Sequence, residues 1–320
     1  MNIIYGRVIK FVDIKLKKNN FIIMKARNKP VFWYLFFTFI FSWSIILIYY
    51  LRGGKWNTPV SVVIGVIYMF MPMTSVLIVK KIIFKENIKE ALAVRFNINR
   101  WWFAGWLLPL FVAVASLGVS LLFPNVFYSS DMTGFFERFQ NIIPADKIAG
   151  MKADLKNLPL HPFWLGLIQG LIAGPTVNAV AAFGEELGWR GFLVDELKYM
   201  GFWRASFIIG FVWGVWHAPI ILMGHNYPAH PVAGVLFMII FTILLSPIFS
   251  YIRLKAKSVI AAAVLHGSLN ATSGLAVILL KGGNDLLIGV TGLAGFIVLT
   301  VINVILFIII KQDKSVFETE

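Results

Sequence analysis

The chain contains no cysteine among its 320 residues, and this absence excludes disulfide bonds, thiolate catalysis and cysteine-bound zinc. Charged residues are also scarce, because Asp, Glu, Lys and Arg make up 14% of the sequence whereas hydrophobic residues make up 59%. Soluble domains carry about 25% charged residues. A chain with so few charged residues cannot cover its surface with polar groups as a water-soluble protein does. The sequence therefore indicates an integral membrane protein.

Long charge-free runs recur along the chain and define its architecture. They span residues 31–51, 60–79, 101–123, 163–183, 232–251, 259–280 and 286–310. About 20 apolar residues cross the hydrocarbon core of a bilayer as one helix. The stretch 205–252 has no Asp, Glu, Lys or Arg and is too long for one crossing, so we expect it to fold back at residues 225–231. We predict an all-α, polytopic bundle of about eight transmembrane helices.

The remaining segments give a simple domain organisation. We expect a basic N-terminal tail (1–30), a single transmembrane helical domain (31–310) and a short C-terminal tail (311–320). Of the 29 Lys and Arg residues, 22 fall in segments on the side of the two tails and 7 on the opposite side. Because Lys and Arg accumulate in cytoplasmic segments, we predict a multi-pass protein of the cell membrane with both termini in the cytoplasm. The same asymmetry explains the net charge of +14, and no nucleic-acid-binding module is recognisable.

Ionisable residues interrupt the apolar segments at only a few positions. Two adjacent carboxylates, Glu185 and Glu186, lie in an apolar helical stretch, and His217 and His266 each lie deep in another. Such groups are costly at membrane depth, so they tend to face a protein interior or a water-filled cavity and to mark functional sites. Arg190 follows Glu186 by four residues, a helical spacing at which the two side chains can pair. That pair would leave Glu185 free to point elsewhere.

The spacing around Gly201 predicts that a carboxylate and an imidazole meet. Glu185 precedes Gly201 by 16 residues and His217 follows it by 16. A helical hairpin that turns at Gly201 therefore places both side chains at the same depth. A glutamate beside a histidine can hold and deprotonate a water molecule.

A third polar element lies on the seventh predicted helix. His266 and Asn270 are four residues apart and project from one helix face, and Gly267 between them permits close approach of another helix. Two convergent donors can stabilise the oxyanion of a tetrahedral intermediate. Together with the activated water, these groups would suffice for hydrolysis of a peptide bond inside a membrane.

Each feature also has a simpler interpretation. The two glutamates could mark a solvated helix end, His217 could be a packing histidine, and His266 with Asn270 could link neighbouring helices by hydrogen bonds. Three further histidines are interpreted as surface residues of external loops: His161, His225 and His230.

Three ordered motifs resemble one known family. They read Glu-Glu-Leu-Gly-Trp-Arg at 185–190, Trp-Gly-Val-Trp-His at 213–217 and His-Gly-Ser-Leu-Asn at 266–270. This order resembles the type II CAAX prenyl endopeptidases and their bacterial relatives, the CAAX-protease and bacteriocin-processing group, also called the Abi family. The resemblance covers about residues 163–275. It implies an eight-helix membrane endopeptidase whose site opens towards the cytoplasm and whose substrate is a peptide or protein at the membrane.

The resemblance also implies roles for individual residues. Glu185 and His217 would position and activate the water, and His266 and Asn270 would form the oxyanion hole. Two residues would support the site: Glu186 and Arg190. One departure concerns Trp213, where the family usually has phenylalanine; we expect an aromatic packing role to be kept and the substrate groove to be reshaped.

The sequence leaves two questions open: whether the site holds a metal ion, and whether the protein is an enzyme. Glu185, His217 and His266 could hold a divalent metal such as zinc with an open position for water. The chain lacks the His-Glu-x-x-His helix of zinc peptidases, and the resemblance is equally compatible with a water activated by Glu and His alone. The alternative function is a non-catalytic membrane binding, immunity or proton-coupled transport protein that uses the same polar cluster.

Overall fold

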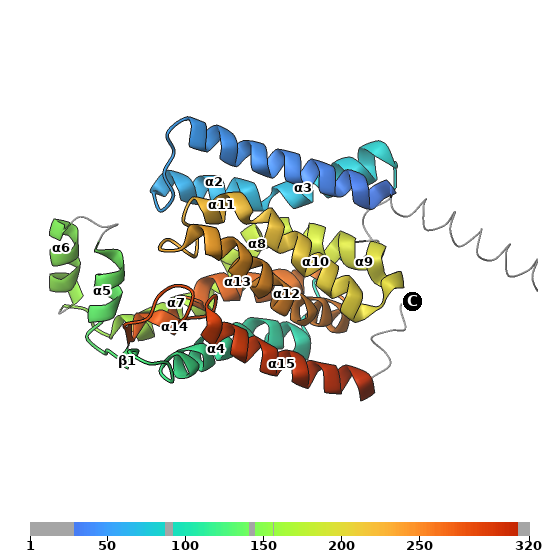
Figure 1. Ribbon diagram of the computed structural model, residues 1–320. Coiled ribbons are helices and arrows are strands. Elements are labelled where there is room, and N and C mark those ends of the chain that lie inside the picture. Colours follow the sequence, from blue (N-terminus) through green and yellow to red (C-terminus); the bar gives the residue numbers. More distant parts are fainter. Residues whose placement is uncertain (1–28, 87–91, 141–144, 156, 313–320) are drawn as a thin grey trace, which may run out of the picture.

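The computed structural model describes residues 29–86, 92–140, 145–155 and 157–312. Seven helices are long and apolar enough to cross a membrane: Lys29–Leu51, Pro59–Ile83, Arg100–Ser120, Pro162–Met200, Pro231–Ala256, Val259–Ile278 and Leu293–Gln312. A shorter apolar helix spans Phe202–Trp216. The predicted all-α, polytopic architecture is thereby confirmed, and Figure 1 shows the helices side by side in one elongated bundle.

Several of these spans consist of more than one helical segment. The second contains α2 (Pro59–Met69), α3 (Met71–Leu77) and the π-helix η1 (Ile78–Ile83). The fourth contains α7 (Pro162–Ala173), η2 (Gly174–Asn178), α8 (Ala179–Glu186), η3 (Leu187–Leu193), α9 (Val194–Leu197) and η4 (Lys198–Met200). The others are α4 (Arg100–Ser120), α10 (Phe202–Trp216), α11 (Ala218–Leu222), α12 (Pro231–Ala256), α13 (Val259–Thr272), α14 (Leu275–Ile278) and α15 (Leu293–Gln312).

A small extramembrane part connects the third and fourth spans. It contains α5 (Thr133–Phe139), α6 (Ala145–Leu155) and strand β1 (Phe127–Tyr128), which pairs antiparallel with β2 (Leu280–Lys281). Arg138 on α5 donates hydrogen bonds to the carbonyl oxygens of Val277, Leu280 and Gly282. These bonds attach the connection to the segment that follows α13.

Helix boundaries follow local signals in the sequence. Asn99 and Ser258 cap α4 and α13 with their side-chain oxygens, and Thr58 forms a capping box with Ser61 at the start of α2. The fourth span ends at Gly201, whose φ of 81° suits glycine and closes the predicted hairpin. The span continues to Met200, well beyond the charge-free run 163–183, and most of the charged residues in its second half form ion pairs.

Those pairs lie where the fourth span meets its neighbours. Arg253 of α12 contacts Asp195 at 3.1 Å, and Lys80 of η1 contacts Glu196 at 2.8 Å. Ion pairs of this kind compensate charges that would be costly near the bilayer. The charged second half of the span can therefore remain helical.

The bundle has two distinct ends. The ends of the described chain, Lys29 and Gln312, lie together at what we call the terminal end, with the turns at Gly201 and Lys257 (Figure 1, right). The opposite loop end carries the segments 52–58, 121–140, 145–155, 157–161, 223–230 and 279–292 (Figure 1, left). The predicted tails 1–30 and 311–320 lie almost wholly outside the described residues.

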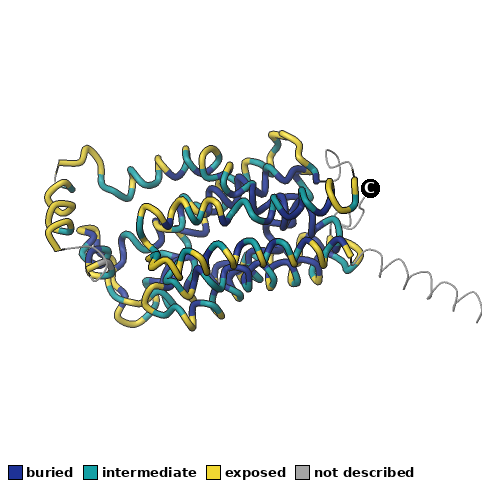
Figure 2. Tube along the Cα trace, turned by 90° about the horizontal axis from the view of Figure 1, so that it is seen from above, coloured by how far each residue is buried: buried dark blue, intermediate teal, exposed yellow. Residues whose placement is uncertain are grey.

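Burial increases towards the centre of the bundle (Figure 2). Helix α13 is enclosed most fully, with 72% of its most apolar window buried, whereas the corresponding value for Lys29–Leu51 is 22%. Small residues allow this enclosure, since a Cβ on Gly174 would lie 2.8 Å from the Cα of Ser268. Helix α13 thus brings His266 into the protein interior, where α8 and α10 surround it.

Candidate active site

The two glutamates end helix α8, immediately before the π-helix η3. Glu185 is 2% exposed and Glu186 is fully buried. The preceding Gly184 permits this position, because a Cβ there would lie 2.7 Å from the carbonyl oxygen of Met69 and 2.9 Å from the Cα of Phe70. π-Helical turns occur frequently at functional sites, and here the turn begins directly after the carboxylates.

Glu186 is the centre of a buried charge network. Arg190 Nη1 lies 3.2 Å from each of its carboxylate oxygens, so the pairing expected from the i,i+4 spacing is present. His266 Nδ1 lies 2.8 Å from Glu186 Oε1 and donates to it. The carboxylate therefore orients the imidazole and leaves its Nε2 atom for other contacts.

The Arg190 guanidinium lies between two aromatic rings. Its central carbon is 4.3 Å from the ring centroid of Trp213 and 4.6 Å from that of Phe249. Cation–π contacts of this kind stabilise a desolvated guanidinium by about 2 kcal/mol. Arg190 thus connects the charge network to the aromatic side chains of α10 and α12.

Trp213 contacts several of the predicted site residues. Its indole Nε1 donates a hydrogen bond of 2.8 Å to Glu185 Oε2, and its carbonyl oxygen accepts one of 2.7 Å from His217 Nδ1. Its ring centroid lies 5.5 Å from that of His266. The role expected for this residue was aromatic packing; the structure adds a hydrogen bond that phenylalanine could not make.

His217 caps the C-terminus of α10 and is 7% exposed. Because a carbonyl oxygen only accepts hydrogen bonds, the bond to Trp213 assigns the proton of the neutral imidazole to Nδ1. The Nε2 atom then carries a lone pair, which can accept a proton or a hydrogen bond.

All four residues assigned to catalysis by resemblance line one cavity of about 320 Å³. They are Glu185, His217, His266 and Asn270. The first three are buried among helices, whereas Asn270 is exposed. The structure thus brings together side chains that are separated by up to 85 positions in the sequence.

Further residues line the same cavity without having been singled out from the sequence. Tyr68 is 1% exposed, and its hydroxyl donates to the carbonyl oxygen of Trp216. His225 was interpreted as a surface residue; instead it lines the cavity, and its Nδ1 accepts a 3.1 Å hydrogen bond from Trp56 Nε1. Burial lowers the pKa of His225 to about 4. The one sequence feature that could have identified Tyr68 as a site residue is its polar hydroxyl group within the charge-free run 60–79.

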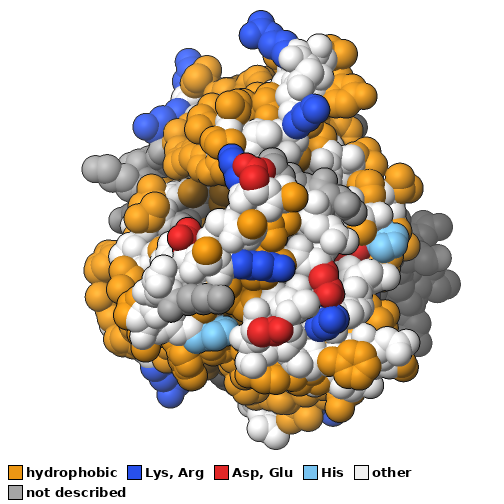
Figure 3. Space-filling model, turned by 90° about the vertical axis from the view of Figure 1, so that its left-hand side faces the viewer, with side chains coloured by type: hydrophobic (Ala, Val, Ile, Leu, Met, Phe, Trp, Pro, Cys, Tyr) orange, Lys and Arg blue, Asp and Glu red, His pale blue; other side chains and the backbone are white. Residues whose placement is uncertain are grey.

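The cavity lies between the carboxylates and the loop end of the bundle. Its lining includes Trp56, His225, Asn226 and Thr291, which belong to the connections at that end. Figure 3 views the molecule from this end, where charged, histidine and hydrophobic side chains are intermixed. We expected the site to open to the cytoplasm and both termini to lie in the cytoplasm. Because the cavity leads away from the terminal end, these two expectations cannot both hold.

The donor set does not fit a metal site. Among the residues that the structure describes, no three His, Asp or Glu side chains are grouped so that they could hold one metal ion. A catalytic zinc site needs three such ligands around a common point. The zinc interpretation of Glu185, His217 and His266 is therefore not supported.

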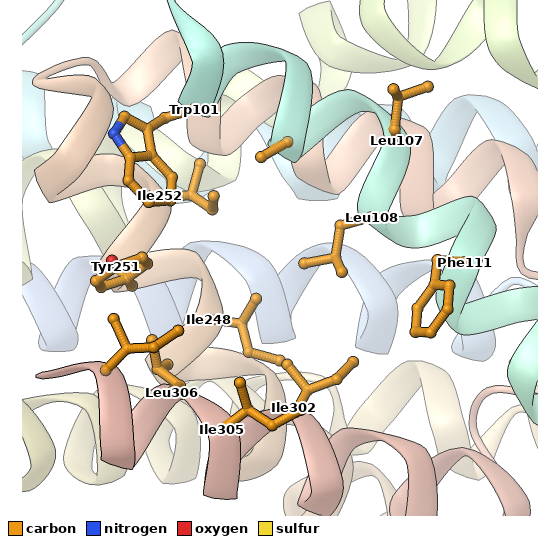
Figure 4. A pocket seen from close by; sticks show the side chains of 12 residues that line it. Trp101, Leu107, Leu108, Phe111, Ile248, Tyr251, Ile252, Ile302, Ile305 and Leu306 are labelled. Carbon is orange, nitrogen blue, oxygen red and sulfur yellow. The ribbon is translucent and has the colours of Figure 1, made fainter.

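A second cavity, of about 410 Å³, differs in character. It lies between α4, α12 and α15 and is lined by hydrophobic side chains such as Leu108, Ile248 and Ile305 (Figure 4). It contains none of the polar residues singled out from the sequence. The combination of acid, base and amide thus belongs to the cavity at Glu185.

Comparison with known proteins finds a similarity over the part of the chain that contains this site. Residues 162–272 match the family model described as Type II CAAX prenyl endopeptidase Rce1-like. The CAAX prenyl protease 2 of Methanococcus maripaludis is 31% identical over 105 residues, a match that covers 31% of this chain and 39% of that protein. The matched range contains Glu185, His217, His266 and Asn270. Residues 162–272, about a third of the chain, are thus similar to the Type II CAAX prenyl endopeptidase Rce1-like family, and the chain spans 39% of the length of the curated relative that it matches.

Proposed function

We propose that the protein is an integral membrane endopeptidase that hydrolyses a peptide bond with a water molecule activated by Glu185 and His217. The observation that carries this proposal is the convergence of Glu185, His217, His266 and Asn270 on one cavity enclosed by transmembrane helices. The similarity of residues 162–272 to the Type II CAAX prenyl endopeptidase Rce1-like family supports the same reaction class.

Glu185 is the general base of the proposed reaction. Its Oε2 atom accepts the Trp213 indole N–H, which fixes the carboxylate and leaves Oε1 for a water molecule. The lone pair on His217 Nε2 accepts a second hydrogen bond from that water. As the water oxygen attacks the carbonyl carbon, Glu185 takes one of its protons and later passes it to the leaving amine nitrogen, so that the C–N bond breaks and a carboxylic acid and an amine form.

His266 and Asn270 stabilise the oxyanion of the intermediate. With Nδ1 bonded to Glu186, an imidazolium at His266 presents its Nε2–H to the cavity, and the Glu186 carboxylate balances its charge. The Asn270 amide supplies the second donor from the same helix face. Removing one donor of an oxyanion hole typically costs about 10²–10³ in rate.

The test is hydrolysis of defined peptides by the purified protein in detergent. Because the matched relative is named a CAAX prenyl protease, one probe is an internally quenched peptide that ends in a farnesylated Cys-aliphatic-aliphatic-X sequence. The second probe is an unlipidated quenched peptide of Ala, Leu, Ser and Gly. We expect Glu185→Gln and His217→Gln to lower kcat by about 10²–10⁴, because each removes one part of the water-activating pair.

Matched controls separate chemistry from folding. Glu137→Gln removes a carboxylate from an ion pair whose two side chains are about half exposed, and His161→Asn keeps the N-cap of α7. Both controls should retain wild-type turnover and the wild-type unfolding temperature. Wild-type turnover in both Glu185→Gln and His217→Gln would show that the catalytic assignment is wrong.

A further inference from the structure

The cavity is closed towards the terminal end. On the side of Glu185 that faces the terminal end, every residue of η3 is buried. Glu186, Arg190 and Trp189 are completely inaccessible to solvent. Phe249 stacks on Arg190 and is also fully buried. A substrate that approached from the terminal end would have to displace this ion pair and its aromatic neighbours.

Towards the loop end, the cavity meets accessible residues. Asn226 and Asn270 are exposed, and Trp56, Ser273 and Thr291 are partly exposed. These residues come from connections between helices rather than from the packed core. The accessible route to Glu185 therefore begins at the loop end.

The distribution of basic residues indicates which side of the membrane each end faces. Of the 19 Lys and Arg residues in the described part of the chain, 13 lie in segments at the terminal end and 6 in segments at the loop end. Lys and Arg accumulate on the cytoplasmic side of multi-pass proteins. The terminal end thus belongs in the cytoplasm and the loop end outside it.

The lining of the cavity restricts what can enter. No Lys or Arg lines it among the described residues, and Glu185 is its one acidic group there. Aromatic and aliphatic side chains, including Trp216, Met238 and Phe241, alternate with the neutral polar groups Asn226, Ser273 and Thr291 in the lining. Such a cavity suits an uncharged peptide segment, because Glu185 is engaged by Trp213 and by the proposed water, and the described lining offers a substrate charge no other carboxylate, Lys or Arg as a partner.

We propose that the cavity takes its substrate from the extracytoplasmic face, and that the substrate is an uncharged segment of an exported or membrane-inserted polypeptide. The nature of the reaction rests on the proposed function, whereas the sidedness does not. This places the site on the opposite side from the cytoplasmic opening that the family resemblance implied.

Sidedness is tested by thiol labelling, since a chain without cysteine makes every introduced cysteine unique. Ser273→Cys reports on the cavity, Lys55→Cys on the loop end and Lys198→Cys on the terminal end. Intact cells are treated with a small, membrane-impermeant methanethiosulfonate before and after permeabilisation. We expect Ser273→Cys and Lys55→Cys to react in intact cells, and Lys198→Cys to react only after permeabilisation.

The reverse pattern overturns the proposal. Reaction of Lys198→Cys in intact cells, or a Ser273 thiol that reacts only after permeabilisation, places the site on the cytoplasmic side. A Ser273 thiol that reacts in neither case but reacts in denatured protein shows that the cavity is closed, which also overturns the proposal.

Substrate charge is tested with the protein purified in detergent, where a peptide can reach both ends of the bundle. The unlipidated Ala, Leu, Ser and Gly peptide is compared with a matched peptide that carries two Lys residues around the scissile bond. We expect kcat/KM for the charged peptide to be at least tenfold lower, and equal values would overturn the proposed selectivity. If the Ser273 thiol reacts in intact cells but no peptide is hydrolysed, the proposed peptidase activity is refuted and the sidedness is not. If a peptide is hydrolysed but the Ser273 thiol reacts only after permeabilisation, the sidedness is refuted and the peptidase activity is not.

Discussion

At the scale of single residues, Trp213 best illustrates what side-chain chemistry adds to a motif. Its ring stacks on Arg190, its indole N–H binds Glu185 and its carbonyl oxygen binds His217. One residue thus orients both proposed water-activating groups. Its effect on the reaction acts through its neighbours, so it is a positioning residue.

Trp213→Phe tests this positioning role. Phenylalanine keeps an aromatic ring beside Arg190 but loses the hydrogen bond to Glu185, and a bond to a charged group contributes about 1.5–3 kcal/mol. We expect kcat to fall by about 10–100-fold with KM nearly unchanged, and the unfolding temperature to fall because the buried hydrogen bond and part of the core packing are lost. Trp164→Phe, at a 54% exposed position on α7, is the matched control. Unchanged kcat in Trp213→Phe would mean that the indole N–H does not position the base.

His225 predicts a pH dependence of stability. Burial lowers its folded-state pKa to about 4, whereas the unfolded chain protonates it near the ordinary value of about 6.5. Between these values the unfolded state binds the additional proton, so stability is highest above pH 6.5 and declines as the pH falls towards 4. Protonation of Nδ1 would also remove the acceptor for Trp56.

Measuring the unfolding temperature in detergent between pH 7.5 and 4 checks this expectation. His225→Gln keeps an acceptor for Trp56 but cannot be protonated, so its unfolding temperature should fall less than that of the wild type. Parallel curves for the two proteins would contradict the assignment. His161→Asn serves as a control for the removal of a histidine elsewhere.

At the scale of elements, the fourth span is the unusual one. It joins three α-helical segments, two π-helices and a 3₁₀ turn over Pro162–Met200, and its carboxylates lie where α8 meets η3. Close packing against the second span holds this junction, because Gly184 touches the backbone at Met69 and Phe70. The position of Glu185 therefore depends on a glycine contact as well as on its own hydrogen bond.

Gly184→Ala tests that dependence. The added Cβ meets backbone atoms that cannot rotate away, so we expect a loss of about 1–3 kcal/mol in stability together with reduced kcat. Gly118→Ala on α4 is the matched control, because nothing lies within 4 Å of its Cβ position. That control should be neutral or stabilising, since alanine favours helix by about 0.5–1 kcal/mol over glycine. Equal stability of the two variants would refute the packing argument.

At the scale of the whole molecule, four separate helices supply the polar groups of one cavity. The carboxylate comes from α8, the imidazoles from the end of α10 and from α13, and Tyr68 from α2. Among the residues that the structure describes, no three His, Asp or Glu side chains form a group that could hold one metal ion. The assembled site therefore favours activation of water by side chains.

Chelation checks this expectation. Treatment of the purified protein with 1,10-phenanthroline or EDTA should leave turnover within about twofold of the untreated value, and added zinc should not increase it, because no three ligands converge. Loss of turnover on chelation and its recovery with zinc would contradict the metal-free mechanism.

Much of the fold could be predicted from local patterns. Charge-free runs identified the spans, and Gly201 correctly ended the fourth helix. The ion pairs of Asp195 with Arg253 and of Glu196 with Lys80 could not be predicted, because the partners are remote in the sequence. His225 was misjudged for a related reason: its neighbour Trp56 is 169 positions away.

The sequence by itself determined the membrane class, the helical architecture and the Glu186–Arg190 pair, because hydropathy and i,i+4 spacing are local properties. Only the tertiary structure decided that Glu186 binds His266, that Trp213 binds Glu185, and that the cavity leads to the loop end. Those outcomes depend on how helices cross and which loops lie beside them, and no local pattern encodes the distance between remote segments.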